Sequence, residues 1–518
     1  MNGANALLRT LVAGGVDTCF MNPGTSEMHF VAALDDVPEM RGVLALFEGV
    51  ATGAADGYAR MAERPAAVLV HLGPGLGNGI ANLHNARRAH SPVVCVVGDH
   101  ATYHKQFDAP LESDIDALAS NVSGWIRRSM KTSELPADAA AAIAAAVGPP
   151  GQVATLILPA DVSWTEGAEP IAAAADASFH EPDADAIAGA VAAFRTGQPV
   201  ALLVGGRACR ADALTLAGAI SAATGAKLLS ETFPARLERG AGRVEPERLA
   251  YFGEMAVAQL DGVAHLMLVG AKSPVAFFAY PDKPSDLVHD GCWVHTLAGA
   301  GDDVLAALEA LAAELGLDRD ACGASSVAER PDPPDSGPLT TDSLGRAIGA
   351  LLPEGAVVAD ESNTSGLFIA GATAGAPPHD WLTLTGGSIG IGLPLATGAA
   401  VACPDRKVVA LEADGSAMYT AQALWTMARE GLDVTVVVLS NRSYAILNME
   451  LRRVGASAGG PRAHSMLDLH NPELDFVSLA TGMGVPAVRA ETAADFYKML
   501  SDALSESGPR LVEAVITR

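Results

Sequence analysis

Two oxygen-bearing side chains stand at the ends of neighbouring apolar runs near the C-terminus. Asp414 follows the run 408–411, and Asn441 follows the run 434–439, 27 positions after Asp414. If both runs are strands of one βαβ unit, these side chains meet at the carboxyl edge of a sheet, where α/β proteins bind ligands. A carboxylate, an amide oxygen and backbone carbonyls, with no Cys or His beside them, suit Mg²⁺ or Ca²⁺. Such a cation usually holds the phosphate groups of a ligand.

The residues after Asp414 fit the same chemistry. Gly415 and Ser416 begin a helix-like stretch and offer backbone N–H groups and a hydroxyl to phosphate oxygens. Asp-Gly-Ser after a strand is also an ordinary helix cap, so this segment alone does not decide between the two interpretations. Asn441 at the end of the next strand favours the phosphate site.

Acidic and imidazole groups in the N-terminal part could move protons. Glu48 opens an Ala/Gly-rich helix after an apolar run, where interaction with the helix dipole is an equally ordinary explanation. His71 ends the run 67–70, and it either faces a site or is a satisfied structural histidine. His100 and His104 lie on the loop after the run 93–97 and are weaker candidates, because two His four apart also occur on solvated helices.

The elements that must position these groups are short apolar runs that alternate with Ala-rich helical stretches. Continuous apolar runs of this length are typical of parallel strands buried on both faces by helices. Two Pro- and acid-rich stretches, from Trp164 to about Asp185 and from Ala328 to Pro338, indicate linkers. They divide the chain into blocks 1–165, 185–320 and 338–518, each of ordinary domain size. We therefore predict an α/β fold of three doubly wound parallel-sheet domains.

The composition narrows the class of protein. The 518 residues include 34 Lys and Arg against 60 Asp and Glu, and a net charge of −26 argues against nucleic acid or a membrane surface as partner. Hydrophobic residues make up 49% of the chain, which excludes extensive disorder. Six scattered cysteines without a Cys-x-x-Cys pair, and no expected signal peptide, favour a reducing cytoplasm. The uncharged run 381–404 is interrupted by glycines, which favours a turn and a buried helix over a membrane span.

The 414–441 pattern resembles the fingerprint of thiamine diphosphate enzymes, which opens with Gly-Asp-Gly and closes with Asn-Asn. Ala413 and Ser440 replace the first residue of each motif, whereas Asp414 and Asn441 are retained. The resemblance implies that these two side chains and the backbone carbonyl of Ser443 bind Mg²⁺.

The glycine-rich segment 385–394 resembles the family's loop under the cofactor, although in isolation it is equally a glycine turn before a core helix. Ile389 matches the bulky apolar residue that keeps the cofactor bent. Segment 360–364, which follows another apolar run, would supply hydroxyl and amide groups to the diphosphate.

The N-terminal block carries the matching half of the resemblance. Residues 44–59 are similar to the family's pyrimidine-binding segment, which implies that Glu48 bonds to N1′ of the pyrimidine and promotes the imino form of the cofactor. Loops 22–27 and 71–79 also match active-site loops of the superfamily. Thr25 and His71 match positions that benzoylformate decarboxylase fills with a catalytic Ser and His. The implied cofactor-binding residues are Glu48, Pro23, Gly24, Asn78, Asn363, Thr364, Gly387, Ser388, Ile389, Asp414, Gly415, Ser416, Asn441, Ser443, Tyr444 and Ala445.

Over nearly its full length the chain is similar to the acetolactate synthase and benzoylformate decarboxylase branch. This implies decarboxylation of a 2-oxo acid, carboligation, or both. It also implies a homo-oligomer, a dimer at minimum and commonly a tetramer, in which the pyrimidine domain of one subunit meets the diphosphate domain of another. By alignment, Phe278 stands near the place of the decarboxylase's second His, and Glu450 stands at that of a synthase Trp that selects the acceptor. These departures leave the substrate open.

Two other interpretations stay open. One is a cofactor-binding or regulatory paralogue without turnover, which Ala413 and Ser440 allow and which Glu48, Asp414 and Asn441 oppose. The other is a flavin-dependent oxidase of the same architecture. The central block lacks the Arg-Phe-Asp-Asp-Arg type of segment seen in flavin-binding relatives, so bound FAD is not expected.

Overall fold

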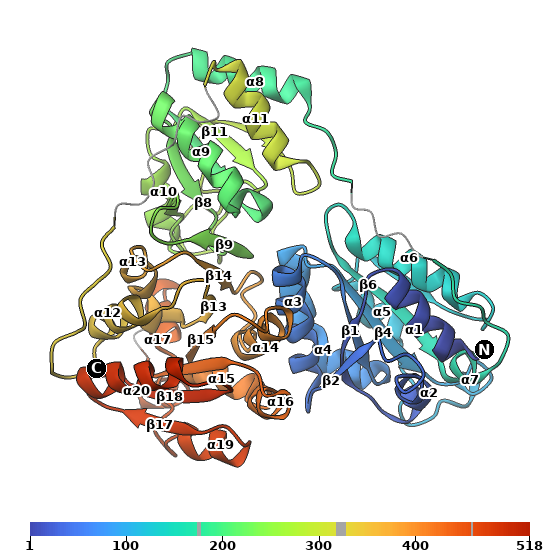
Figure 1. Cartoon of the computed structure of the whole chain (residues 1–518). Coiled ribbons are helices and arrows are strands. Elements are labelled where there is room, and N and C mark those ends of the chain that lie inside the picture. The colour runs from blue at the N-terminus through green and yellow to red at the C-terminus, as the bar shows by residue number, and fades with distance from the viewer. Residues whose placement is uncertain (173–177, 318–327, 457–458, 518) are drawn as a thin grey trace.

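The chain forms three lobes, each built around its own sheet (Figure 1). The computed structural model describes residues 1–172, 178–317, 328–456 and 459–517. The predicted boundary at residue 320, Cys322 and the terminal Arg518 lie outside the described residues. The five cysteines within them are free thiols. The boundaries of the three blocks stay a prediction.

Within the described residues, the first lobe holds a six-stranded sheet whose paired strands are all parallel, in the order β2-β1-β3-β4-β6-β5. Strands β3, β4 and β6 are buried along their whole length, as expected of continuous apolar runs covered on both faces. The strands are β1 Thr18–Asn22, β2 Arg41–Leu44, β3 Ala66–Val70, β4 Val93–Asp99, β5 Trp125–Arg128 and β6 Val153–Pro159. The helices are α1 Gly3–Ala13, α2 Met28–Ala33, α3 Glu48–Ala62, α4 Leu72–Ala89, α5 Ile115–Ser120, α6 Leu135–Val147 and α7 Ala160–Trp164, with the 3₁₀ turns η1 Thr25–Glu27 and η2 Lys105–Phe107.

The second lobe, as far as it is described, holds a five-stranded parallel sheet in the order β10-β8-β7-β11-β12. The strand order reverses between β7 and β11, so the carboxyl ends of these strands form a switch point of the kind that binds ligands. The strands are β7 Val200–Val204, β8 Lys227–Ser230, β10 Glu247–Arg248, β11 His265–Val269 and β12 Trp293–Ala298. The helices are α8 Ala184–Arg195, α9 Ala211–Thr224, α10 Gly253–Leu260 and α11 Val304–Glu314, with η3 Gly206–Cys209.

In the described part of the third lobe, seven strands form a sheet in the order β17-β18-β16-β15-β13-β14-β9. All pairs are parallel except β14 with β9, and β9 comes from the middle of the chain. The strands are β9 Arg236–Arg239, β13 Val357–Glu361, β14 His379–Thr383, β15 Val408–Ala413, β16 Val434–Ser440, β17 Ala487–Ala490 and β18 Arg510–Val515. The helices are α12 Thr341–Leu351, α13 Ile369–Ala372, α14 Gly392–Ala402, α15 Asp414–Thr420, α16 Ala423–Glu430, α17 Ala445–Arg453, α18 Pro461–Ser465, α19 Phe476–Gly482 and α20 Ala493–Ser505, with η4 Asn363–Gly366.

Helices α3 and α14 join the first and third lobes (Figure 1). Their backbones approach so closely that a Cβ on Gly57 would lie 2.1 Å from the carbonyl oxygen of Leu395, and a Cβ on Gly398 would lie 1.8 Å from that of Ala54. Buried apolar residues of both lobes belong to one hydrophobic cluster around this crossing. The packing therefore fixes the start of α3, which carries Glu48, and the glycine-rich loop that precedes α14.

The prediction of three α/β domains with doubly wound parallel sheets is confirmed, and the antiparallel β9 is the departure from it. The uncharged run 381–404 forms the end of β14, the glycine-rich loop and α14. No helix within the described ranges is long and apolar enough to cross a membrane.

Candidate active site

Asp414 lies where β15 ends and α15 begins, at the carboxyl edge of the third sheet. Its side chain is buried, and its Oδ1 accepts the N–H of Gly415 at 2.8 Å while its Oδ2 accepts the N–H of Arg442 at 2.5 Å. Burial raises the pKa of Asp414, and these backbone N–H groups act in the opposite direction. The loop after β16 is thereby tied to the carboxylate that the sequence places in the cation site.

Asn441 and its neighbours meet Asp414 from two other strand ends. The amide of Asn441 donates to the hydroxyl of Ser365 at 2.8 Å, and its Oδ1 accepts the N–H of Ser443 at 2.9 Å. Asn363, in a left-handed conformation with φ of 50°, donates to the hydroxyl of Ser416 at 3.0 Å. Thr364 lies in the same turn, η4. The fold thus brings amides and hydroxyls from the ends of β13, β15 and β16 into one cluster.

The donors of this cluster fit a diphosphate held by a hard cation. In the described ranges, no group of three or more His, Cys, Asp and Glu side chains could hold a metal by itself. A cation beside Asp414 would therefore share amide, carbonyl and ligand oxygens, which is how Mg²⁺ usually binds with phosphates. The ring of Tyr444 covers this edge of the sheet. Position 415 must be glycine, because a Cβ there would lie 2.4 Å from that ring. Tyr444 and Ala445 stand at the start of α17.

The glycine-rich loop is held from both adjoining lobes. Gly387 and Gly390 have φ values of 73° and 92°, which glycine adopts without strain. From α4, Asn85 accepts the N–H groups of Gly386 and Ser388 at 3.1 and 3.3 Å. Ile389 is half-buried and packs against the hydrophobic cluster that joins the lobes. The loop therefore presents a fixed apolar side chain between the first and third sheets.

Glu48 is the first residue of α3 and is 9% exposed. The side-chain amide of Asn78, on α4, donates to its Oε2 at 3.0 Å. Gly75, on the same helix, leaves room for the carboxyl group, since a Cβ there would lie 3.3 Å from Oε1. The structure brings these two predicted residues together and gives the Glu48 carboxyl one orientation.

His71 is paired with a carboxylate that the sequence analysis missed. The Oε2 atom of the fully buried Glu27 lies 2.7 Å from Nδ1 of His71 and accepts the N–H of Gly24 at 2.7 Å. Burial raises the pKa of Glu27, and the neighbouring His71 and Gly24 lower it. Pro23 and the exposed Thr25 flank Gly24 on the same loop. The available signal was a Glu three residues after Gly24 at the start of a helical turn, a spacing at which the carboxylate can accept the N-cap N–H.

These groups form two sets in different lobes. Glu48 and His71 are held by residues at the carboxyl edge of the first sheet, and Asp414 is held by residues at that of the third. Both sets lie at the carboxyl edge of parallel strands, where the sequence analysis expects them.

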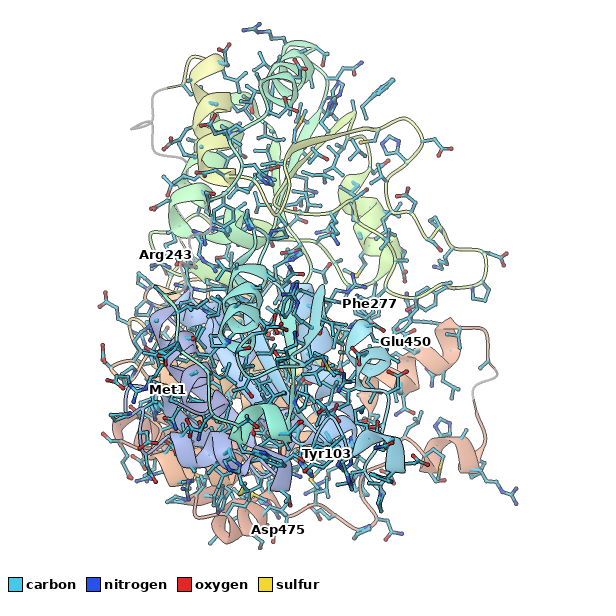
Figure 2. All side chains as sticks on the ribbon, turned by 90° about the vertical axis from the view of Figure 1, so that its right-hand side faces the viewer. Met1, Tyr103, Arg243, Phe277, Glu450 and Asp475 are labelled. Carbon is cyan, nitrogen blue, oxygen red and sulfur yellow. The ribbon has the colours of Figure 1, made fainter. Side chains whose placement is uncertain are left out.

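The second lobe adds aromatic side chains beside the glycine-rich loop. A Cβ on Gly387 would lie 2.7 Å from Cζ of Phe277, whose ring packs against Phe233 and Tyr251 with centroids 5.8 and 5.2 Å apart. Phe277, one position before the residue chosen by alignment, therefore contacts the loop. Glu450 of α17 (Figure 2) acts on Tyr251, which packs against Phe277, and its charge adds to burial in raising the pKa of Tyr251 to about 12.

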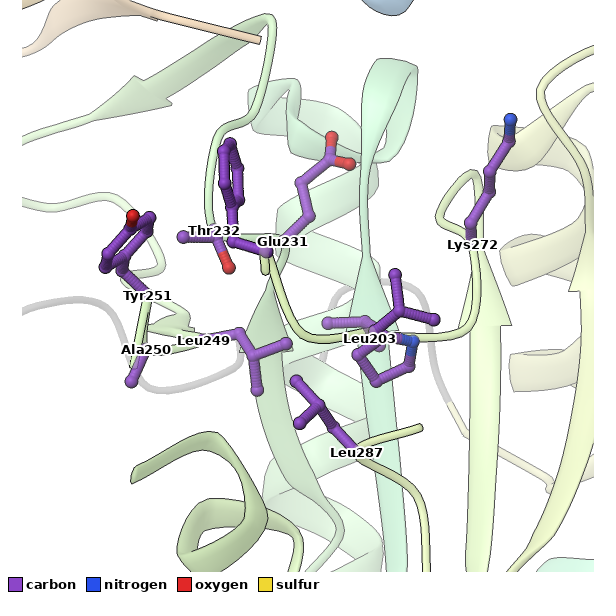
Figure 3. Close-up of a pocket in the computed structure, with 11 residues that line it drawn as sticks. Leu203, Glu231, Thr232, Leu249, Ala250, Tyr251, Lys272 and Leu287 are labelled. Atoms are coloured by element: carbon purple, nitrogen blue, oxygen red, sulfur yellow. The ribbon is translucent and has the colours of Figure 1, made fainter. Parts of the chain in front are cut away.

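A cavity of about 100 Å³, lined in part by Tyr251 and Phe277, lies at the switch point of the second sheet (Figure 3). Glu231, at the end of β8, accepts the N–H of Gly206 at 2.9 Å, in the turn after β7. Burial raises the pKa of Glu231 to about 7, against the lowering effects of Gly206 and Lys272. In dinucleotide-binding sheets the N–H groups of this turn face a phosphate, whereas here one of them faces a carboxylate.

Two family models match the lobes that carry the two sets of residues. The model described as thiamine pyrophosphate enzyme, N-terminal TPP binding domain, matches residues 1–120. The corresponding C-terminal TPP binding domain matches residues 365–514. The chain belongs to the thiamine pyrophosphate enzyme family.

Relatives of this thiamine pyrophosphate enzyme cover its full length. A Mycobacterium tuberculosis protein named "Putative acetolactate synthase large subunit IlvX" is 60% identical over 100% of this chain and 99% of its own. A benzoylformate decarboxylase of Pseudomonas aeruginosa is 30% identical over 96% of each chain. The solved structure of a thiamine diphosphate-dependent 4-hydroxybenzoylformate decarboxylase from Rhodococcus jostii RHA1 shares the fold, with a TM-score of 0.85, 23% identity, and coverage of 100% of this chain and 99% of that one.

Proposed function

We propose that this protein is an Mg²⁺-dependent thiamine diphosphate enzyme that decarboxylates a 2-oxo acid, either releasing an aldehyde or joining the product to a second carbonyl. The observation that carries the proposal is the cluster of Asp414, Asn441 and Ser443 at one sheet edge. Family membership identifies the cofactor class, and relatives named as synthase and decarboxylase support both outcomes.

The third lobe would hold the charged end of the cofactor. Asp414, Asn441 and the backbone carbonyl of Ser443 would bind Mg²⁺, and Ser416 and Asn363 would bind phosphate oxygens at the start of α15. Bound thiamine diphosphate supplies the electron sink that makes loss of carbon dioxide possible.

The first lobe would supply the groups that donate and accept protons. Glu48, oriented by Asn78, would hydrogen-bond to pyrimidine N1′, as the family resemblance implies. Glu27 holds Nδ1 of His71, so that the other ring nitrogen is available for proton transfer to and from the substrate. The hydroxyl of Thr25, exposed on the neighbouring loop, would orient the substrate carboxylate.

We further propose that two chains complete each site, with a dimer as the minimum and a tetramer as the expected assembly. The two sets of residues are fixed in different lobes, and exposed apolar side chains lie near both of them. Tyr103 and Phe107 are 61% and 67% exposed in the first lobe, and Leu367 and Tyr419 are 62% and 53% exposed in the third. Exposed apolar groups of this kind are typical of surfaces covered by a partner.

The central test is Glu48→Gln, with Glu39→Gln on an exposed loop as the matched control. Apoprotein should bind thiamine diphosphate only with Mg²⁺, and both variants should retain that binding. Exchange of the cofactor C2 proton, followed by NMR, should be abolished in Glu48→Gln and unchanged in the control. Normal exchange in Glu48→Gln would overturn the mechanism. A screen of 2-oxo acids for carbon dioxide release, with and without aldehyde acceptors, would identify the substrate.

A second candidate function is a cofactor-binding paralogue without turnover, which Ala413 and Ser440 favour because they depart from the family motifs. It predicts Mg²⁺-dependent binding of thiamine diphosphate together with no release of carbon dioxide from any 2-oxo acid in the screen. A flavin-dependent oxidase is less well supported, because Glu231 takes an N–H group that a nucleotide phosphate would need. Purified protein is therefore expected to be colourless.

A further inference from the structure

Two acidic side chains lie side by side beneath the candidate site. Glu361, the last residue of β13, lies in direct register with Glu412, the last but one residue of β15, and the two are only 2% and 0% exposed. Their carboxyl groups converge on Gly392, where a Cβ would lie 3.0 Å from Oε2 of Glu361 and 2.1 Å from Oε2 of Glu412. Buried carboxyl groups are costly unless hydrogen bonds satisfy them, so their placement calls for an explanation.

The two carboxyl groups hydrogen-bond to each other, but only Glu361 accepts the N–H groups of Gly390 and Gly392. The Oε1 atom of Glu361 accepts the N–H of Gly390 at 2.7 Å, and its Oε2 accepts the N–H of Gly392 at 2.5 Å. These N–H groups belong to the end of the glycine-rich loop and the start of α14. The residue at the N-cap of α14 is Ile391, whose side chain forms no capping hydrogen bond. The carboxylate of Glu361, from strand β13, therefore accepts the free N–H at the start of α14 in place of an N-cap side chain. Its charge also interacts favourably with the dipole of this helix.

The position of Glu361 in the chain links two walls of the site. It immediately precedes Ser362, Asn363 and Thr364, the segment that would bind the diphosphate. Through Gly390 it also holds the residue that follows Ile389, the apolar side chain under the cofactor. One buried carboxylate thus sets the distance between the phosphate-binding turn and the Ile389 loop.

We propose that Glu361 is a positioning residue that fixes Ile389 relative to the diphosphate-binding turn, so that the loop is shaped before the cofactor binds. This inference rests on the proposed cofactor site. An ordinary helix cap would stabilise the whole fold without a particular effect on cofactor binding, and that difference makes the proposal testable.

The test compares Glu361→Gln with Glu412→Gln. A glutamine at 361 turns one N–H₂ group toward a backbone N–H and loses one of the two loop hydrogen bonds. We expect its affinity for thiamine diphosphate, titrated with Mg²⁺ into apoprotein, to fall by roughly tenfold, which corresponds to one lost hydrogen bond to a charged group. Glu412→Gln changes the equally buried neighbour, which accepts neither of these two N–H groups and as glutamine can still donate a hydrogen bond to Glu361. The affinity of this variant for thiamine diphosphate should therefore change less than about threefold.

Hydrogen exchange of the apoprotein gives an independent readout. In Glu361→Gln, exchange should accelerate in peptides covering 386–392 and stay at the wild-type rate in β16 and α20. Ile389→Ala should weaken cofactor binding, and adding Glu361→Gln to it should cost little more, because both changes act through one side chain. If Glu361→Gln does not fold, Glu361→Asp, with a shorter reach, takes its place in both measurements.

The outcomes separate this inference from the proposed function. Unchanged affinity and unchanged loop exchange in Glu361→Gln would overturn the inference, and so would faster exchange spread evenly over the chain. If wild-type protein binds no thiamine diphosphate, the proposed function fails, and exchange confined to 386–392 still supports Glu361 as the anchor of the loop.

Discussion

At the scale of single residues, the imidazole of His71 depends on one buried carboxylate. Glu27 is fully buried, and its Oε2 binds both Nδ1 of His71 and the N–H of Gly24. A carboxylate on Nδ1 holds a histidine in one tautomer and one orientation, which is the arrangement general acid–base catalysis requires.

We expect Glu27→Gln to lower kcat for the 2-oxo acid by roughly 10²-fold, because the tautomer of His71 is no longer held. His71→Ala should cost at least as much, and the double variant no more than His71→Ala alone, since the two residues act as one unit. Steady-state kinetics of the three variants checks this, with thiamine diphosphate affinity as the control that should not move. Additive losses would show that Glu27 acts independently of His71.

The placement of the candidate residues was predictable from sequence where it follows a spaced motif, and it was hidden where it depends on contacts between distant strands. The positions of Asp414 and Asn441 at a sheet edge could be predicted because each comes within three residues of the end of an apolar run. Glu361 and Glu412 could not, because in a chain with 60 acidic residues a buried carboxyl looks like a solvated one. The spacing from Gly24 to Glu27 indicated a helix-start contact but not the bond of Glu27 to His71. The apolar surroundings of Glu412 in Val-Val-Ala-Leu-Glu-Ala were the one signal of its burial.

At the scale of elements, the acid at the end of β8 should make stability depend on pH. The pKa of Glu231 is about 7 in the folded protein, against an ordinary value of 4.5, because the site is shielded from water. Between these values the folded state keeps a proton that the unfolded state has released, so the free energy of unfolding falls as pH rises from 4.5 to 7.

Glu231→Gln should remove this dependence. The unfolding temperature of the variant, measured relative to wild type, is expected to rise steadily from pH 5 to pH 7.5 and to level off above it. Other titrating groups, including Glu361, are present in both proteins and cancel in the difference. A constant difference across this pH range would contradict the raised pKa.

The crossing of α3 and α14 gives a second prediction at this scale. Gly398→Ala places a methyl group 1.8 Å from the carbonyl oxygen of Ala54, so the helices must separate, at a cost of about 1–3 kcal/mol. Gly189→Ala, at an exposed position of α8 where a Cβ meets nothing within 4 Å, should instead stabilise by about 0.5–1 kcal/mol. Urea unfolding of both variants measures the difference. Equal effects would mean that the close crossing carries no constraint.

At the scale of the whole molecule, Arg60 joins the three lobes. Its guanidinium pairs with the buried Asp56 and donates to the carbonyl oxygens of Ala235 and Thr383 and to the hydroxyl of Thr385. Arg60→Met leaves Asp56 buried without its cation, which should lower the free energy of unfolding by about 3–5 kcal/mol. Arg64→Met breaks an exposed pair with Asp17 and the contact of the guanidinium with the ring of Tyr58, and it should cost only about 1–2 kcal/mol. Similar unfolding midpoints for the two variants would argue against this junction.

The proposed assembly predicts complementation between inactive chains. Glu48→Gln damages only the first-lobe set, and Asp414→Asn damages only the third-lobe set. If each site is shared between two chains, unfolding and refolding them together should restore about a quarter of wild-type activity, since half of the dimers are mixed and each has one intact site. Each variant refolded alone is the control. No recovery in mixtures whose subunits demonstrably exchange would place both sets in the same chain.

The way in which the three lobes are joined could be predicted least well from sequence patterns. Three α/β domains follow from local periodicity, because each buried parallel strand is a continuous apolar run. Strand β9 reads Arg-Leu-Glu-Arg and carries no such pattern, and its partner β14 lies far along the chain. Its pairing depends on the ion pair of Arg236 with Asp380 and on the hydrogen bonds of Arg239 to Thr373 and Ala370, which only the folded chain creates.

The edge strand β9 also has a consequence for the order in which the chain emerges from the ribosome. Its partner β14 is made about 140 residues later, a delay of roughly 7–28 s at ordinary rates of synthesis. During that interval the segment of β9 has no partner strand. Three of its four residues are charged, and charged side chains keep exposed strand edges from pairing with other chains. The charged residues that hold β9 in the folded protein thus also keep the nascent chain from pairing with other chains before the third sheet forms.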